Sequence, residues 1–247
     1  MSDENLAEIR NEKAKKIQHP KGKLTAYERL DLLLDEGSFS EIDQHVASEE
    51  NPEGEAVITG TGTIHGRPVF VFSEDFSVMG GSLGEVVAKK ILKIIDHALE
   101  ARAPIIGIKD SGGARIQEGI SSLFGYAQIF KKNVEASGKV PQISVVVGPS
   151  AGGAVYSPAL TDFIFQVKDI GQLYVTGPAV VKTVTGEDVT FEELGGVEAH
   201  GTKSGVTHQV CETEEQAFEE IRYLMSFLPQ SSSQKPPMFI TEDEPSR

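Results

Sequence analysis

The sequence predicts an α/β domain whose sheet is largely buried. Short apolar runs of strand length, Ile105–Ile108 and Ile143–Val147, each precede a segment with helical hydrophobic spacing. Glycine pairs follow both runs, where a strand would turn into a helix. Strands that alternate with helices are typical of α/β domains, and uninterrupted apolar strands indicate a sheet that is covered on both faces.

The individual elements follow from hydrophobic periodicity and from turn residues. Helical spacing and helix stop signals predict helices over residues 24–35, 84–102, 119–136 and 214–228. Alternation and β-branched content predict strands at Ala56–Ile64, Val69–Ser73, Phe163–Phe165 and Leu173–Val175, the first two forming a hairpin through the turn at 65–68. A short helix should begin near Gly152.

The chain is expected to fold as one domain with two different ends. Its 247 residues are enough to bury one substantial core, which we place at 24–228. Residues 1–23 are charged and irregular, and we expect a flexible or peripheral segment whose lysines, Lys23 included, are solvated or touch a partner chain. Residues 229–247 are rich in proline, serine and acidic side chains, as in a linker or flexible tail.

Composition excludes several classes of protein. The formal net charge of -14 argues against a nucleic-acid backbone or an anionic membrane as partner. The single cysteine, Cys211, cannot form an internal disulfide or a four-thiolate zinc site, and no metal site is expected. The first residues lack the apolar stretch of a signal peptide, and no apolar run approaches the ~20 residues that span a bilayer. A cytoplasmic protein is therefore expected.

Two glycine-rich turns are the strongest candidates for a site. Gly112-Gly113 follows the run at 105–109, and Gly152-Gly153 follows the run at 143–147. Glycine permits positive φ and close approach to a ligand, and a following helix offers unpaired N–H groups and a positive dipole end. Two such turns in neighbouring units can meet at one oxyanion, although tight turns required only for packing give the same pattern. Neither turn matches a dinucleotide or P-loop fingerprint.

A serine hydrolase is a competing interpretation of the second turn. Residues 148–152 read Gly-Pro-Ser-Ala-Gly, the Gly-x-Ser-x-Gly pattern of a nucleophile elbow between a strand and a helix. Aspartates and the histidines His200 and His208 follow in the order that a Ser…Asp…His triad requires. The pattern is short, however, and Pro149 beside Ser150 is unusual for that elbow.

Longer blocks of sequence resemble a known family. Residues 75–82, 110–119, 148–162, 176–178 and 184–196 resemble signatures of the carboxyltransferase (beta) subunit of biotin-dependent acyl-CoA carboxylases, of the propionyl-CoA and acetyl-CoA carboxylase type. The blocks stand in the order and spacing of the family. The resemblance extends from about residue 24 to residue 228, and it matches only the N-terminal half of the family chain.

The resemblance implies a fold and a site. The implied fold is crotonase-like (ClpP/crotonase), with stacked ββα units in a single domain. The residues matching the family's backbone oxyanion hole are Gly152 and Gly153. The residues matching its substrate-binding turns are Ser111, Gly112, Gly113, Ala114, Arg115, Ser150 and Ala151. Arg115 has two open interpretations, a contact to CoA phosphates and a structural ion pair.

The resemblance also implies a reaction. A carboxyl group would move from carboxybiotin to the α carbon of a short acyl-CoA, propionyl-CoA or acetyl-CoA, through an enolate held by backbone N–H groups. Such a donor is worth ~3–4 kcal/mol of barrier. Biotin would sit on a separate carrier protein or domain. The implied partners are the biotin carboxyl carrier, the biotin carboxylase subunit and the missing C-terminal carboxyltransferase half, in a homo-oligomer of full-length chains.

Two further interpretations share these blocks. A CoA-ester decarboxylase subunit of the methylmalonyl-CoA type would use the same oxyanion site for the enolate that remains after loss of CO2. A non-catalytic assembly fragment would retain only the oligomer contacts. The carboxylates Glu85, Glu118, Asp162 and Glu187 lie in or beside the blocks, where solvated or capping roles are favoured over general-base roles.

Overall fold

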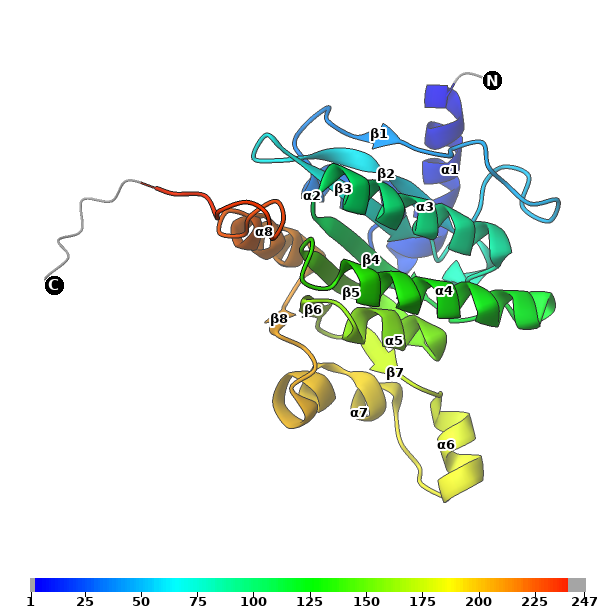
Figure 1. Ribbon diagram of the computed structural model, residues 1–247. Coiled ribbons are helices and arrows are strands. Elements are labelled where there is room, and N and C mark those ends of the chain that lie inside the picture. Colours follow the sequence, from blue (N-terminus) through cyan, green and yellow to red (C-terminus); the bar gives the residue numbers. More distant parts are fainter. Residues whose placement is uncertain (1–2, 240–247) are drawn as a thin grey trace, which may run out of the picture.

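A mixed sheet between two layers of helices forms the body of the protein (Figure 1). The computed structural model describes residues 3–239. The strands are β1 (Ser40–Glu41), β2 (Val57–Ile64), β3 (Arg67–Glu74), β4 (Ile105–Ser111), β5 (Gln142–Ala151), β6 (Phe163–Val167), β7 (Gln172–Tyr174) and β8 (Gln209–Cys211). Their order is β1-β2-β3-β4-β5-β6-β8, and β7 pairs with β5. The predicted α/β class is confirmed.

The pairing of the strands brings the two glycine-rich turns together. β1, β2 and β3 are antiparallel, whereas β3 to β6, β7 and β8 pair in parallel. Parallel strands end at the same edge of a sheet. At that edge Ser111 of β4 lies opposite Ser150 of β5, after a register shift that begins at Lys109. The predicted turns are therefore neighbours in space.

Helices cover both faces of the sheet (Figure 1). One face packs against α2 (Ala26–Leu33) and α8 (Glu214–Met225), in a core that contains Leu30, Phe218 and Ile106. The other face packs against α3 (Glu85–Ala101) and α4 (Ile120–Ala136). All residues of β4 are buried, as a strand covered on two sides requires.

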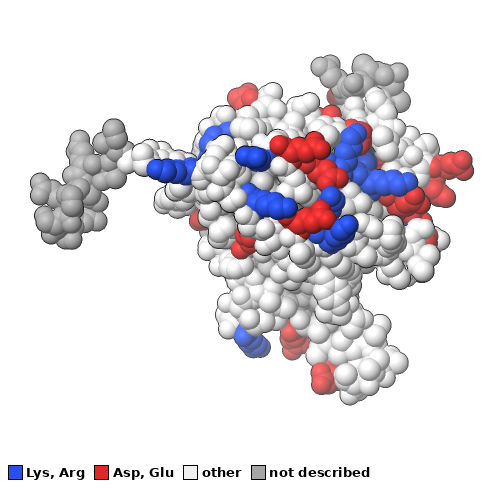
Figure 2. Space-filling model, in the orientation of Figure 1, with Lys and Arg blue, Asp and Glu red and all other residues white. Residues whose placement is uncertain are grey.

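The chain between β7 and β8 forms a smaller lobe that projects from the sheet (Figure 1). It contains α6 (Pro178–Thr185), α7 (Phe191–Gly195) and the π-helical turn η4 (Glu198–Ser204), whereas α5 (Gly153–Ala159) packs against α4 and β5. Neither α6 nor η4 has a buried residue. Figure 2 shows that this part of the surface carries few charged side chains on the face in view, in contrast to the mixed charges above it. The hydrophobic pattern did not predict α6, α7 or η4.

The N-terminal segment differs from its expected irregular structure. Residues Asp3–Gln18 form helix α1, followed by the 3-10 turn η1 (His19–Lys21). Four buried side chains recur every fourth residue on one face of α1: Leu6, Arg10, Ala14 and Gln18. Two of the four are polar, so the face that packs on the domain does not appear as a hydrophobic stripe. This is why periodicity of apolar residues missed the helix.

Smaller differences concern element ends. The hairpin turn is tighter than predicted, since β3 already begins at Arg67 and only His65 and Gly66 have positive φ between the strands. At the other end, Gln230 Nε2 donates to the Pro68 carbonyl at 2.8 Å and Ser231 is buried, so the first residues of the expected tail pack on the domain. The remainder of that tail, 240–247, lies outside the described residues.

Lys90 on α3 offers a pH-dependent test of this packing. Its side chain is buried, its Nζ donates to the Val57 carbonyl at 3.2 Å, and burial lowers its pKa to about 8. The unfolded chain keeps a lysine pKa of ~10.4, so the folded state carries a penalty that is full below pH 8 and vanishes above the unfolded value. Lys90→Met should therefore stabilise the protein by about 2 kcal/mol more at pH 7 than at pH 10.

The measurement is chemical unfolding of variant and wild type at both pH values. Lys89→Met is the matched control, because the Lys89 side chain is 69% exposed and its removal should have the same effect at either pH. If Lys90→Met changed the free energy of unfolding by the same amount at pH 7 and pH 10, burial of the charged lysine would not destabilise the folded state.

Candidate functional site

Three glycine-containing turns meet at the carboxyl edge of β4 and β5. Gly81, in the 3-10 turn η2 (Met79–Gly81), has φ +67, and a Cβ there would lie 2.1 Å from the Asp110 carbonyl oxygen. Gly113 has φ +101, and its Cβ would lie 2.7 Å from the Ala151 carbonyl oxygen. Both the backbone conformation and the close approach exclude a side chain at these two positions. The turns are thus packed directly against one another.

Several N–H groups of these turns are already used inside the protein. The N–H of Gly112 donates to the Gly80 carbonyl at 2.9 Å, and that of Gly113 donates to Ser111 Oγ at 3.1 Å. The N–H of Gly152 donates to the Tyr174 carbonyl of β7 at 3.1 Å. These bonds fix the shape of the turns. They also correct the expectation that Gly152 offers a free donor, because in this structure its N–H is satisfied by β7.

Ala114 and Gly153 carry the donors that remain. Among residues 3–239, the N–H groups of Ala114 and Gly153 have no protein acceptor. Gly153 is the first residue of α5, where an unpaired N–H is expected and where the helix dipole adds partial positive charge. Both residues are partly exposed. The site can therefore present backbone N–H groups to an oxygen that carries negative charge.

The serine side chains of the two turns are buried inside the protein. Ser111 and Ser150 are both 0% exposed, and within the described part of the chain Ser150 Oγ has no hydrogen-bond partner. The histidines that a hydrolase would need lie in other contacts. His200 bonds the Leu173 carbonyl and Ser204, and His208 Nδ1 accepts from the Ile164 N–H. A buried serine without a base does not form a nucleophile, so the structure disfavours the hydrolase interpretation.

Arg115 is held in a buried ion pair, the second of its two open interpretations. Its Nη2 contacts Glu55 at 2.8 Å, its Nη1 contacts Glu118 at 2.8 Å, and the residue is only 3% exposed. Burial alone would raise the pKa of Glu55, but the bond from Arg115 keeps that pKa below its usual value. Glu118 also accepts from the Glu85 N–H at the start of α3, the capping role favoured for it. Arg115 therefore shapes the turn and does not present its guanidinium to a ligand.

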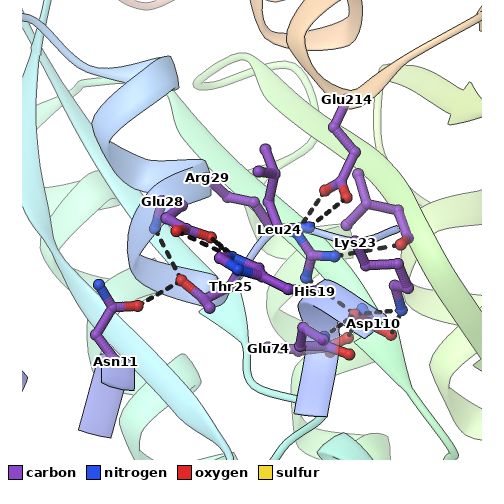
Figure 3. A network of polar contacts seen from close by, with 12 residues as sticks. Asn11, His19, Lys23, Leu24, Thr25, Glu28, Arg29, Glu74, Asp110 and Glu214 are labelled. Carbon is purple, nitrogen blue, oxygen red and sulfur yellow. Dashed lines mark hydrogen bonds and ion pairs between the residues drawn. The ribbon is translucent and has the colours of Figure 1, made fainter. Parts of the chain in front are cut away.

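A buried cluster of charges lies directly before the first turn (Figure 3). Asp110 is 0% exposed and contacts Lys23 Nζ at 2.6 Å, Arg29 Nη1 at 2.9 Å and Gln18 Nε2 at 3.0 Å. Arg29 Nε also contacts Glu214 of α8 at 2.6 Å. The cluster ties α1, α2 and α8 to the end of β4, and so to the residue that precedes Ser111.

The position of Lys23 corrects the expectation of a solvated lysine. Its side chain is 8% exposed, and burial lowers its pKa although the neighbouring Asp110 charge opposes this effect. Burial likewise raises the pKa of Glu214 against the effect of Arg29. No local pattern indicated this cluster, because its members lie far apart in the sequence, with 185 positions between the contacting residues Arg29 and Glu214, and charged residues at single positions are usually solvated.

The described residues contain neither a candidate metal-binding group nor a membrane-spanning helix. Within residues 3–239, no group of three or more histidine, cysteine, aspartate or glutamate side chains is placed to hold a metal ion. No helix in the same range is both long enough and apolar enough to cross a membrane.

The fold and the paired turns are those of a carboxyltransferase domain. Residues 17–247 match the family model described as the carboxyl transferase domain, and the chain belongs to that family. It is 56% identical to the propionyl-CoA carboxylase carboxyltransferase subunit of Haloferax mediterranei, over 93% of this chain and 46% of that one. It is 52% identical to the methylmalonyl-CoA decarboxylase subunit alpha of Veillonella parvula, over 99% of this chain and 50% of that one.

Solved structures agree with this assignment. The chain superposes on transcarboxylase 12S, solved as a hexamer assembly with methylmalonyl-coenzyme A bound, with a TM-score of 0.90 and 46% identity over 96% of this chain and 49% of that one. The predicted crotonase-like fold is confirmed. The chain spans about half the length of the curated relatives that it matches, and the match is to an N-terminal half.

Proposed function

We propose that this chain is the acyl-CoA-binding half of a biotin-dependent carboxyltransferase that acts on a short acyl-CoA such as propionyl-CoA. Transfer of a carboxyl group requires a carbanion beside the thioester carbonyl, and the negative charge then resides on the carbonyl oxygen. The observation that carries the proposal is the N–H group of Gly153, which begins α5 without a protein acceptor among residues 3–239 and lies beside the Gly113 turn.

Backbone N–H groups of this chain would bind the thioester carbonyl. The N–H groups of Gly153 and Ala114 would donate to the thioester oxygen, and the contact between Gly113 and Ala151 would keep the two turns together. Because backbone hydrogen bonds hold the turns that carry these N–H groups, the donors need little reorganisation as charge develops on the oxygen. Carboxybiotin would be a co-substrate delivered on a separate carrier, and we assign its binding site to the C-terminal half of the family chain.

Binding of propionyl-CoA to the isolated chain tests the proposal. Isothermal titration calorimetry should show saturable binding with one ligand per chain, and free CoA should bind more weakly because it lacks the carbonyl oxygen. Addition of the C-terminal half of a matching relative should then allow carboxyl transfer from carboxybiotin. A folded chain that binds neither propionyl-CoA nor acetyl-CoA would contradict the proposal.

A decarboxylase is the second candidate, supported by the 52% identity to the Veillonella parvula decarboxylase subunit over 99% of this chain. The same donors would hold the enolate that remains after CO2 leaves. Release of CO2 from methylmalonyl-CoA, measured in the reconstituted protein with and without biotin carrier, separates the two functions. Carboxylation of propionyl-CoA without net decarboxylation favours the first candidate.

An exposed apolar surface supports assembly with the C-terminal half of the family chain. Its members follow the first turn, in the 3-10 turn η3 (Ile116–Glu118) and on α4: Ile116, Ile120, Leu123 and Phe124, which are 61% to 89% exposed. A groove of about 590 Å³ between α3 and α4 continues this surface. Apolar patches of this kind mark protein interfaces. We propose that the C-terminal half, and through it the oligomer and the biotin carrier, is recruited near this surface.

A further inference from the structure

Tyr126 of α4 lies against the second glycine turn. Its residue is only 4% exposed, and its ring belongs to the core on the α3–α4 face of the sheet. A Cβ at Gly153 would lie 2.5 Å from Tyr126 Cδ2 and 2.7 Å from Tyr126 Cγ. The Gly153 backbone itself needs no positive φ. The requirement for glycine at this position therefore comes from the tyrosine ring.

The same core connects Tyr126 to the first turn. Ala114 of that turn packs against the hydrophobic cluster that contains Tyr126. The Tyr126 hydroxyl is buried and has no hydrogen-bond partner among the described residues, and burial raises its pKa. Tyr126 therefore belongs to a packed cluster that borders both Gly153 and the turn of Ala114.

Aromatic packing holds Tyr126 in this position. Phe130, one helical turn further along α4, stacks on Tyr126 with a centroid distance of 5.9 Å. Tyr156 of α5 meets Phe130 edge-on at 5.8 Å. The ring row connects α4 to α5, the helix that Gly153 begins. Movement of Tyr126 would therefore displace the first N–H groups of α5 relative to the other turn.

We infer that Tyr126 is a positioning residue that sets the place of the Gly153 N–H relative to the Ser111–Ala114 turn, and so determines how well the site recognises a thioester carbonyl. This inference rests on the proposed function. The ring acts through van der Waals contact with the Gly153 backbone, and it touches neither substrate nor reacting atoms. Removal of the ring keeps the Gly153 N–H group itself but allows α5 to shift.

The test compares two ligands that differ only at the carbonyl. Propionyl-CoA carries the thioester oxygen, whereas S-propyl-CoA replaces the carbonyl with a methylene group. Wild-type chain should bind propionyl-CoA roughly fivefold more tightly, the effect of about one hydrogen bond. Tyr126→Leu should bring this ratio close to one, while the affinity for S-propyl-CoA stays within about twofold of wild type because the CoA contacts are unchanged.

Two variants serve as controls. Tyr126→Phe keeps the ring and should keep the ratio. Phe130→Leu keeps the contact of Tyr126 to Gly153 but removes the ring that stacks on Tyr126, and should lower the ratio less than Tyr126→Leu does. If Tyr126→Leu does not fold, as judged by circular dichroism, Tyr126→Met places a flexible, unbranched side chain in part of the space of the ring and should show the same loss.

Gly153→Ala supplies an independent measurement. Its methyl group would push against the ring, so it should lower the ratio in the wild-type background and lower it little further in Tyr126→Leu. Three outcomes would overturn the inference. In Tyr126→Leu, the ratio of the two affinities could stay unchanged, or both ligands could bind more weakly by the same factor. In the double variant, Gly153→Ala could lower the ratio by as much as it does in the wild type. A wild-type chain that binds neither ligand overturns instead the proposed function.

Discussion

Asp110→Asn is expected to lower the free energy of unfolding by about 3–5 kcal/mol, because it removes the carboxylate that pairs with buried Lys23 and one of the two that pair with buried Arg29. Lys23 and Arg29 both contact Asp110, and their side chains are 8% and 0% exposed. After the substitution Arg29 keeps Glu214, but Lys23 keeps no contact of comparable length among the described residues. The effect should be large because neither cation can reach water without opening the packing of α1 and α2.

Urea unfolding followed by circular dichroism measures this effect. Asp188→Asn is the matched control, since Asp188 also pairs with a lysine, Lys182, but its side chain is 81% exposed. Exposed pairs contribute at most ~1 kcal/mol. If Asp110→Asn lowered the free energy of unfolding by no more than the control does, the buried cluster would not stabilise the fold.

Gly113→Ala is expected to weaken propionyl-CoA binding by roughly tenfold or more. Small displacements of the backbone N–H donors greatly weaken their interaction with the ligand. The added Cβ would lie 2.7 Å from the Ala151 carbonyl oxygen, and the backbone is held at φ +101. The two turns must then separate. Their donors would no longer point at one oxygen, and calorimetry should detect the loss.

Gly138→Ala isolates the backbone contribution to this effect. Gly138 also has positive φ, +71, but a Cβ there meets nothing within 4 Å and the residue lies beyond the C-terminal end of α4. It should lose a similar amount of stability from backbone strain, of order 1 kcal/mol, and keep its affinity. Equal affinities of the two variants would contradict the contact between the turns.

The sequence predicted six of the eight strands and the location of the turns, and it missed the short strands β1 and β8. β4 and β5 are apolar runs with glycine pairs behind them, and these features depend on neighbouring residues only. The prediction failed for α1, whose buried face includes Arg10 and Gln18. It also missed α6, a short helix whose apolar residues Val180 and Val184 are exposed. A pattern of apolar residues does not reveal a helix such as α1, whose packing face is partly polar.

The sequence by itself determined an α/β domain of the carboxyltransferase type and placed its two glycine turns after successive strands. Only the tertiary structure decided which N–H groups remain free. Gly152 donates to Tyr174, and Gly153 is kept as glycine by the ring of Tyr126. Likewise, only the fold buries Lys23 against Asp110. The physical reason is the same in each case: a hydrogen bond or contact between distant segments depends on strand register and helix packing, which no local pattern encodes.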